Sequence, residues 1–141
     1  MRLLCIGECM LELAPVEGGL YRRGFAGDTF NTAWYARRQA GPEIEIAYLT
    51  AIGTDEASAQ MEAFIGEAGI VPEVARLTDR TIGLYMIALK NGERSFSYWR
   101  GQSAAKALAE KGVLGRFAVD FISVPEEAGW KHYAIEINLR K

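Results

Sequence analysis

Cysteine and histidine are scarce in this sequence. The 141 residues include two cysteines, Cys5 and Cys9, and one histidine, His132. The spacing of these residues matches no zinc or redox motif, so we expect two reduced thiols in or beside a core strand. The apolar run near Met1 is short and broken by Gly7-Glu8, which is unlike a secretory signal. We therefore expect a cytoplasmic protein.

Long apolar runs and an excess charge of one sign are also missing. No run approaches the roughly 20 apolar residues that span a bilayer, so we expect no membrane partner. The 16 Lys and Arg residues face 18 Asp and Glu residues, giving a formal net charge of -2. Without a basic cluster we expect no nucleic-acid partner. Because 50% of the residues are hydrophobic, the chain can bury a core and form one domain or slightly more.

Strand-like and helix-like segments alternate in the first half of the chain. Strands are predicted at residues 2–7, continued at 10–13, and at 44–52. Helices are predicted at 30–40, with Asp28 or Thr29 as N-cap and Gly41 as C-cap, and at 56 to about 68 after Thr54 or Asp55. Gly18-Gly19 and residues 22–24 mark a loop. This order predicts a βαβ unit with a parallel sheet, an α/β fold.

A β-hairpin is predicted over residues 81–100. Asn91-Gly92 lies between strand-like residues 81–89 and 94–100, and both turn residues must take positive φ. In the two-residue register, Tyr85, Tyr98 and Arg100 share one face beside Gly83, whose missing side chain leaves space. Such a patch suits a hydroxylated carboxylate. An ordinary amphipathic hairpin with tyrosines at a polar boundary is the alternative.

Five segments carry a resemblance to a known family. They are CIGECMLEL at 5–13, RGFAGDTFNTA at 23–33, TAIGTD at 50–55, Gly83-Leu84-Tyr85, and GERSFSYWR at 92–100. Over about residues 1–108 they resemble, in this order, 2-keto-3-deoxygluconate kinases of the ribokinase-like sugar kinase family. The resemblance implies a truncated ribokinase-like sheet with flanking helices and a β-hairpin lid at 81–100. It implies phosphorylation of 2-keto-3-deoxygluconate with ATP and Mg²⁺ by the intact enzyme.

The resemblance also implies which residues bind the sugar acid. Sugar hydroxyls would be held by Gly27, Asp28, Asn31 and Glu12. The lid residues Tyr85, Tyr98 and Arg100 would contact the acid, whose carboxylate a guanidinium can bind bidentately. The structural alternative is a plain helix start at Gly27-Asp28 with a polar first-turn residue at Asn31, and the two roles are compatible.

An ATP site is implied but not matched. The family's Asp-Thr-x-Gly-Ala-Gly-Asp motif, which supplies an anion hole and the catalytic base, is not found in these 141 residues, and neither is a P-loop. We therefore predict no catalytic residue and expect this chain alone not to phosphorylate a sugar. The alternative is a non-catalytic module that binds a sugar acid and forms a homodimer through its lid.

Residues 111–141 resemble a different family. A short helix at 103–110 is followed by predicted strands at 116–124 and 133–139, which we assign to a separate C-terminal β-hairpin after a sugar-binding portion at 1–110. These strands resemble the metal-binding strands of ATP-grasp ligases, which would make Asp120, Glu136 and Asn138 ligands of Mg²⁺. The junction near residue 110 would then be chimeric. An ordinary amphipathic hairpin and a fragment of an ATP-grasp carboxylate–amine ligase are the alternatives.

Overall fold

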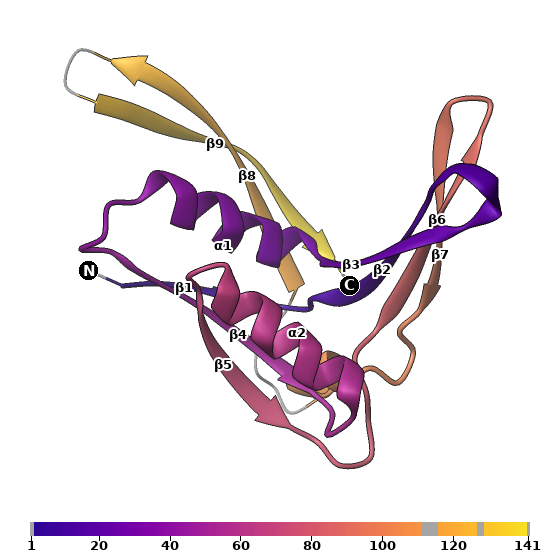
Figure 1. Ribbon diagram of the computed structural model, residues 1–141. Helices are drawn as coiled ribbons and strands as arrows, with labels where there is room; N and C mark the ends of the chain where they lie inside the picture. The colour runs from indigo at the N-terminus through magenta and orange to yellow at the C-terminus, as the bar shows by residue number, and fades with distance from the viewer. Residues whose placement is uncertain (1, 111–115, 127–128, 141) are drawn as a thin grey trace. The chain divides into compact units, whose positions relative to one another are not determined.

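A computed structural model describes residues 2–110, 116–126 and 129–140 of the protein, with side chains for residues 2–107 and 110. The chain divides into two compact units, one ending at Leu108 and one starting at Ala109. The first unit holds two β-sheets and their helices, and the second holds a two-stranded sheet (Figure 1).

The larger unit contains a parallel three-stranded sheet in the order β1-β4-β5. Its strands are β1 (Arg2–Ile6), β4 (Glu45–Ile52) and β5 (Val71–Arg76). Helix α1 (Asp28–Gln39) precedes β4, and helix α2 (Glu56–Glu67) connects β4 to β5. The predicted βαβ unit, the parallel sheet and the α/β fold class are confirmed, whereas β5 had not been predicted.

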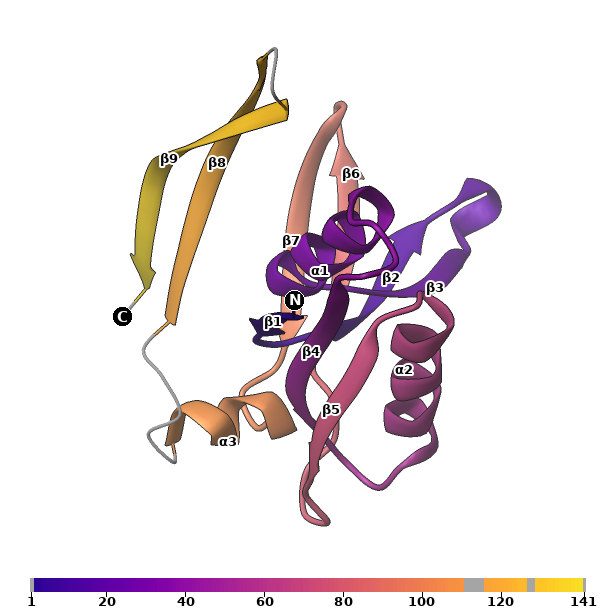
Figure 2. The ribbon, with the colours of Figure 1, turned by 90° about the vertical axis from the view of Figure 1, so that its left-hand side faces the viewer.

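The main core lies between this sheet and the two helices. Alternate residues of β4, among them Ile46, Tyr48 and Ile52, are buried against Phe30 of α1 and Ile65 of α2. Each such side chain contributes about 1.5–3 kcal/mol through burial. The indole of Trp34 stacks on the ring of Phe64 at 5.6 Å, which joins the two helices. Figure 2 shows α2 and the short α3 (Ala104–Glu110) on opposite sides of the sheet.

The two long helices begin differently. The Asp55 carboxylate caps α2 by accepting hydrogen bonds from the Ser58 amide at 3.0 Å and the Ser58 hydroxyl at 2.9 Å, as predicted. For α1 the predicted caps Asp28 and Thr29 are wrong, because the N-cap is Gly27 and no side chain caps the helix. The predicted C-cap Gly41 is wrong by one residue, since Ala40 holds that position.

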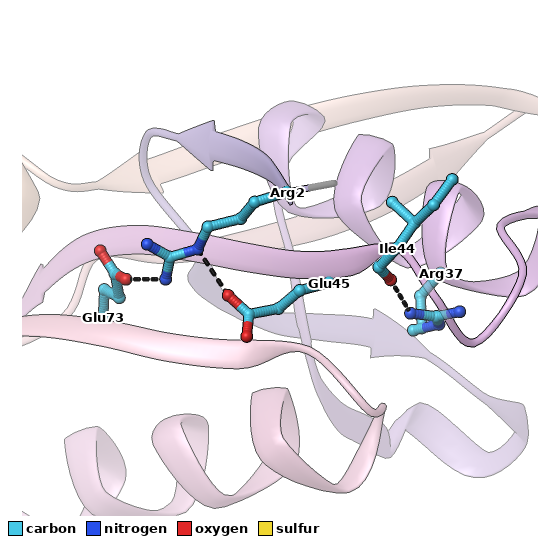
Figure 3. Close-up of polar contacts among 5 residues, drawn as sticks. All are labelled: Arg2, Arg37, Ile44, Glu45 and Glu73. Carbon is cyan, nitrogen blue, oxygen red and sulfur yellow. Dashed lines mark hydrogen bonds and ion pairs between the residues drawn. The ribbon is translucent and has the colours of Figure 1, made fainter.

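Two arginines fix the sheet and the end of α1 (Figure 3). Arg2 on β1 forms ion pairs with Glu45 of β4, at 2.6 Å, and with Glu73 of β5, so one side chain spans all three strands. Arg37 donates to the carbonyl of Ile44 at 2.6 Å and to those of Ala40 and Gly41 at 2.8 Å. It thereby satisfies carbonyls at the negative end of the helix dipole.

A second, four-stranded sheet in the same unit has the order β3-β2-β6-β7. It consists of β2 (Met10–Pro15), β3 (Tyr21–Ala26), β6 (Leu84–Lys90) and β7 (Glu93–Trp99). We call it the lid sheet. The prediction that residues 10–13 continue the first strand is wrong, because the chain changes sheet after β1. The predicted loop at 22–24 is also wrong, since these residues pair with β2.

The predicted hairpin is confirmed in its register. Tyr85 pairs with Tyr98, Ile87 with Phe96 and Lys90 with Glu93. Asn91 and Gly92 both take positive φ, 54° and 82°, as a two-residue turn of this kind requires. Tyr85 and Tyr98 therefore lie on the same face of the lid sheet.

The smaller unit contains the antiparallel pair β8 (Arg116–Glu126) and β9 (Gly129–Arg140), whose register shifts between Asp120 and Phe121. The predicted C-terminal hairpin is thus present, with longer strands than expected. Among the described residues of both units, no helix is long and apolar enough to cross a membrane.

Candidate functional site

One face of the lid sheet brings predicted site residues together from strands far apart in the sequence. Glu12 of β2 pairs with Gly24 of β3 on one side and with Tyr85 of β6 on the other, and Tyr85 pairs with Tyr98 of β7. Paired residues in neighbouring strands point to the same face. The structure therefore aligns Glu12, Tyr85 and Tyr98 in one row across the sheet.

The phenol of Tyr85 is held within this row. Its hydroxyl donates a hydrogen bond to the Glu12 carboxylate, and its ring lies 5.9 Å from the ring of Tyr98 and 6.1 Å from that of Phe96. Burial raises the pKa of Tyr85 above its usual value, and the neighbouring Glu12 raises it further. Tyr85 thus stays a protonated donor at neutral pH, while Tyr98 remains exposed.

Arg100 is paired with a carboxylate that sequence reasoning did not assign. Its guanidinium forms an ion pair with Oε2 of Glu8, whose side chain is 10% exposed. Oε1 of Glu8 lies over Gly83, only 2.7 Å from where a Cβ would stand. The space expected beside Gly83 is therefore filled by Glu8. The signal that could have revealed it is an acidic residue between Gly7 and Cys9 in an otherwise apolar segment.

Glu8 also touches the start of α1. A Cβ on Gly27 would lie 2.2 Å from the carbonyl oxygen of Glu8, so only glycine permits this approach. The Thr29 hydroxyl, bonded to Tyr48 at 2.9 Å, occupies the space beside Gly7 in the same way. The loop that carries Glu8 is thus clamped between α1 and the lid sheet.

The remaining predicted hydroxyl-binding residues lie in the first turn of α1. Asp28 and Asn31 are exposed there, and the Asn31 amide donates to the carbonyl of Gly27 at 2.7 Å. Glu8 is the residue that connects this turn to the lid, because it contacts Gly27 through its backbone and Arg100 through its side chain. The structure therefore joins the two halves of the predicted site through a residue that was not in it.

Both cysteines are free thiols, with Cys5 on β1 and Cys9 directly after Glu8. Burial raises the pKa of Cys9 to about 12 and also raises that of the half-buried Cys5. Thiols that stay protonated are poor nucleophiles and poor metal ligands. The expectation of reduced thiols beside a core strand is met.

The predicted metal ligands Asp120, Glu136 and Asn138 have side chains outside the described part of the structure. Their backbone positions are known: Asp120 pairs with Glu136, and Asn138 pairs with Ala118. The three positions therefore share one face of the β8–β9 hairpin. Metal binding there stays a prediction.

The fold defines an α/β protein of the ribokinase-like sugar kinase type, with a β lid beside a parallel sheet. The model of the pfkB family of carbohydrate kinases matches residues 1–118. The chain belongs to this family. The match continues past residue 110, into the segment that resembled ATP-grasp ligases.

Relatives of known name agree with this assignment. The chain is 44% identical over 108 residues to the 2-dehydro-3-deoxygluconokinase of Escherichia coli K12, which covers 74% of this chain and 35% of that protein. The fructokinase structure from Xylella fastidiosa superposes with a TM-score of 0.65 at 25% identity, covering 74% and 34% of the two chains. The 2-dehydro-3-deoxygluconokinase structure from Thermotoga maritima gives 0.66 at 18% identity, over 74% and 34%, and shows the shared fold. The chain thus spans about a third of the length of these relatives.

Proposed function

We propose that residues 2–107 form the sugar-acid-binding part of a kinase that phosphorylates 2-keto-3-deoxygluconate, also named 2-dehydro-3-deoxygluconate, with ATP. The observation that carries this proposal is the lid face, where the Tyr85–Tyr98 pair lies beside Glu12 and the guanidinium of Arg100 completes the same face. Phenols and a carboxylate suit sugar hydroxyls, and a guanidinium suits a carboxylate. The name of the Escherichia coli relative supports the same substrate.

The substrate assignment is tested by binding to the 141-residue chain. We expect 2-keto-3-deoxygluconate to raise the melting temperature, since ligand at a hundred times its Kd adds about 2.7 kcal/mol of stability. The comparison ligand is 3-deoxyfructose, in which a CH₂OH group replaces the carboxylate. If 3-deoxyfructose stabilises the chain as much as the acid does, the role of Arg100 is wrong.

A matched pair of variants isolates the guanidinium. Arg100→Gln should abolish the preference for the acid over 3-deoxyfructose. Arg76→Gln is the control. Arg76 is also paired with a glutamate, Glu62, but it lies on β5 of the parallel sheet and not on the lid sheet. This variant should leave the preference unchanged. Loss of the preference in both variants would point to a general charge effect.

The ATP and Mg²⁺ requirement is proposed for the kinase as a whole. Sugar kinases of this family use ATP with a divalent metal. Asp120, Glu136 and Asn138 carry the oxygen ligands that Mg²⁺ prefers, and their shared face on the hairpin supports a joint role. Calorimetric titration of the 141-residue chain with Mg²⁺ tests these ligands, and weaker Mg²⁺ binding in Glu136→Gln would support them. Unchanged affinity for Mg²⁺ in that variant would exclude them.

A second candidate function, a non-catalytic module that dimerises through the lid, is favoured by one observation. Three large apolar side chains on one face of the β6–β7 hairpin are exposed, namely Leu89, Phe96 and Tyr98. Exposed apolar clusters of this kind often mark interfaces. Sedimentation equilibrium should show a dimer that Phe96→Lys dissociates and that Tyr35→Lys, a change of an exposed aromatic on α1, leaves intact. A monomeric wild type would reject this candidate.

A further inference from the structure

The carboxylate of Glu8 stands in the position that the proposed function gives to the carboxylate of the substrate. Oε2 of Glu8 forms an ion pair with the guanidinium of Arg100. Oε1 lies in the space that a side chain at Gly83 would fill. These are the group and the space that the hairpin register assigns to a bound sugar acid. We propose that Glu8 occupies the carboxylate subsite of the ligand-free protein and is displaced by the sugar acid, which makes Glu8 an internal competitor that sets the affinity for the acid. The inference rests on the proposed function.

In the part of the chain that the structure describes, only one of the two carboxylate oxygens of Glu8 has a polar partner. Among the described residues, Oε1 of Glu8 has no hydrogen-bond partner although it is buried, so the carboxylate is kept in place by Arg100 alone. A buried acceptor without a donor is costly, and this cost is removed when the carboxylate moves to a position where a donor can reach it. When the Glu8 carboxylate leaves Arg100, it therefore breaks a single ion pair, and within the described ranges it loses no other polar side-chain contact.

The guanidinium of Arg100 is accessible enough to exchange one carboxylate partner for another. Its side chain is 37% exposed, compared with 10% for Glu8, so solvent weakens the ion pair. Two carboxylates beside one guanidinium would repel each other at close range. Since the space over Gly83 is already filled by Oε1, a substrate carboxylate there must replace Glu8 rather than join it.

The exchange affects charged and neutral ligands differently. A neutral sugar carries no group that can take over Arg100, so binding it either leaves Glu8 in place or leaves the guanidinium unpaired. A sugar acid replaces one carboxylate by another and keeps the guanidinium paired. Glu8 therefore lowers the affinity of the subsite for acids by a moderate factor and has little effect on neutral sugars, which bind without displacing it.

The deciding experiment measures Kd for 2-keto-3-deoxygluconate and for 3-deoxyfructose with the 141-residue chain and with Glu8→Gln. The glutamine keeps the shape but competes weakly for Arg100, so we expect the acid to bind about two- to fivefold more tightly, within the range of a partly exposed ion pair. The affinity for 3-deoxyfructose should change by less than about twofold. Glu62→Gln, which breaks the ion pair with Arg76, should alter neither affinity.

Opposite results overturn the inference. If Glu8→Gln weakens binding of the acid, Glu8 orients Arg100 for the substrate instead of competing with it. If the variant strengthens both ligands equally, or if Glu62→Gln has the same effect, the exchange is not specific. If neither the wild type nor Glu8→Gln binds the acid, the proposed function itself fails, which is a different outcome from binding that Glu8 does not affect.

A measurement on the wild-type protein avoids dependence on the folding of a variant. The side-chain carboxyl ¹³C resonance of Glu8 and the Nε resonance of Arg100 should shift together as 2-keto-3-deoxygluconate is added. 3-Deoxyfructose should leave the Glu8 resonance in place. A Glu8 resonance that stays constant while Arg100 responds to the acid would show that the carboxylate does not move.

Discussion

Tyr85 donates a hydrogen bond to Glu12 across the parallel pair of β6 and β2, although the two residues are 73 positions apart in the sequence. The hydrogen bond fixes the direction of the carboxylate and leaves its other oxygen for a second donor. Tyr85 is only 8% exposed, whereas Glu12 is half-buried, so the hydrogen bond joins a buried ring to a carboxylate that solvent and ligands can still reach. The pair therefore forms the inner edge of the proposed sugar site.

Tyr85→Phe should disturb the site with little change in shape. Glu12 loses its donor, so we expect the free energy of unfolding to fall by about 1 kcal/mol and the affinity for 2-keto-3-deoxygluconate to fall about tenfold. Chemical denaturation and calorimetric titration measure the two effects. Tyr35→Phe, which removes the hydroxyl of an exposed tyrosine on α1, is the control and should change neither quantity. Wild-type affinity in Tyr85→Phe would remove Glu12 and Tyr85 from the site.

The turn that sets the lid register can be tested by two glycine substitutions of opposite expected sign. A Cβ at Gly92 or at Gly66 would meet nothing within 4 Å, so neither change causes a clash. Gly92 has a φ of 82°, however, whereas Gly66 lies within α2. Gly92→Ala should cost about 1 kcal/mol of stability, and Gly66→Ala should add about 0.5–1 kcal/mol. Urea denaturation of both variants checks the signs, and equal effects would contradict the turn assignment.

The β6–β7 hairpin could be predicted because its register depends on adjacent residues. Asn91-Gly92 specifies the turn, and the side-chain faces follow from strand alternation. Strand β3 could not, since Arg22-Arg23-Gly24 has the composition of a loop and becomes a strand only by pairing with β2. Strand β5 was also missed, because it contains Pro72 and Glu73, which are unusual in strands. It lies at the edge of its sheet, where such residues are tolerated.

The positions of the candidate site residues in the fold were predictable to the same extent, and their role in binding stays a prediction. Tyr85 and Tyr98 followed from the hairpin, and Glu12 from the family resemblance. The contacts of Glu8 were missed because Gly83 and Arg100 approach it only when the lid sheet forms. Asp28 was expected to cap α1, but the close approach of Gly27 to the Glu8 carbonyl fixes the helix start one residue earlier.

That close approach gives a further test. Gly27→Ala would place a Cβ 2.2 Å from a backbone carbonyl, which cannot move aside like a side chain, whereas a Cβ at Gly24 would lie 3.7 Å from the Glu12 carboxylate, an ordinary contact. We expect Gly27→Ala to lose about 1–3 kcal/mol of stability through overpacking and Gly24→Ala to stay within about 0.5 kcal/mol. Thermal and urea denaturation distinguish them. Equal stability of the two variants would mean that the Glu8 loop is not clamped against α1.

The pH dependence of stability should report the cap of α2. Burial alone would raise the pKa of Asp55, but hydrogen bonds from Thr81 and Ser58 outweigh it and hold the pKa below its usual value. A carboxyl with a lowered folded-state pKa contributes stability that is complete above its unfolded pKa of about 3.9 and is lost as the pH falls through the folded value. Asp55→Ala should therefore cost about 1–2 kcal/mol at pH 7.

The cost should shrink as the pH falls from about 4 toward 2, because the wild-type carboxyl becomes protonated and no longer accepts two hydrogen bonds as a charged group. Asp79→Ala is the control, since Asp79 is an exposed aspartate after β5, and it should show no cost that depends on pH in this way. Urea denaturation of the three proteins between pH 2 and pH 7 measures the difference. An Asp55→Ala cost that stays constant over this range would mean that the charge of Asp55 does not stabilise the helix, and that its effect comes from packing around the buried Ser58.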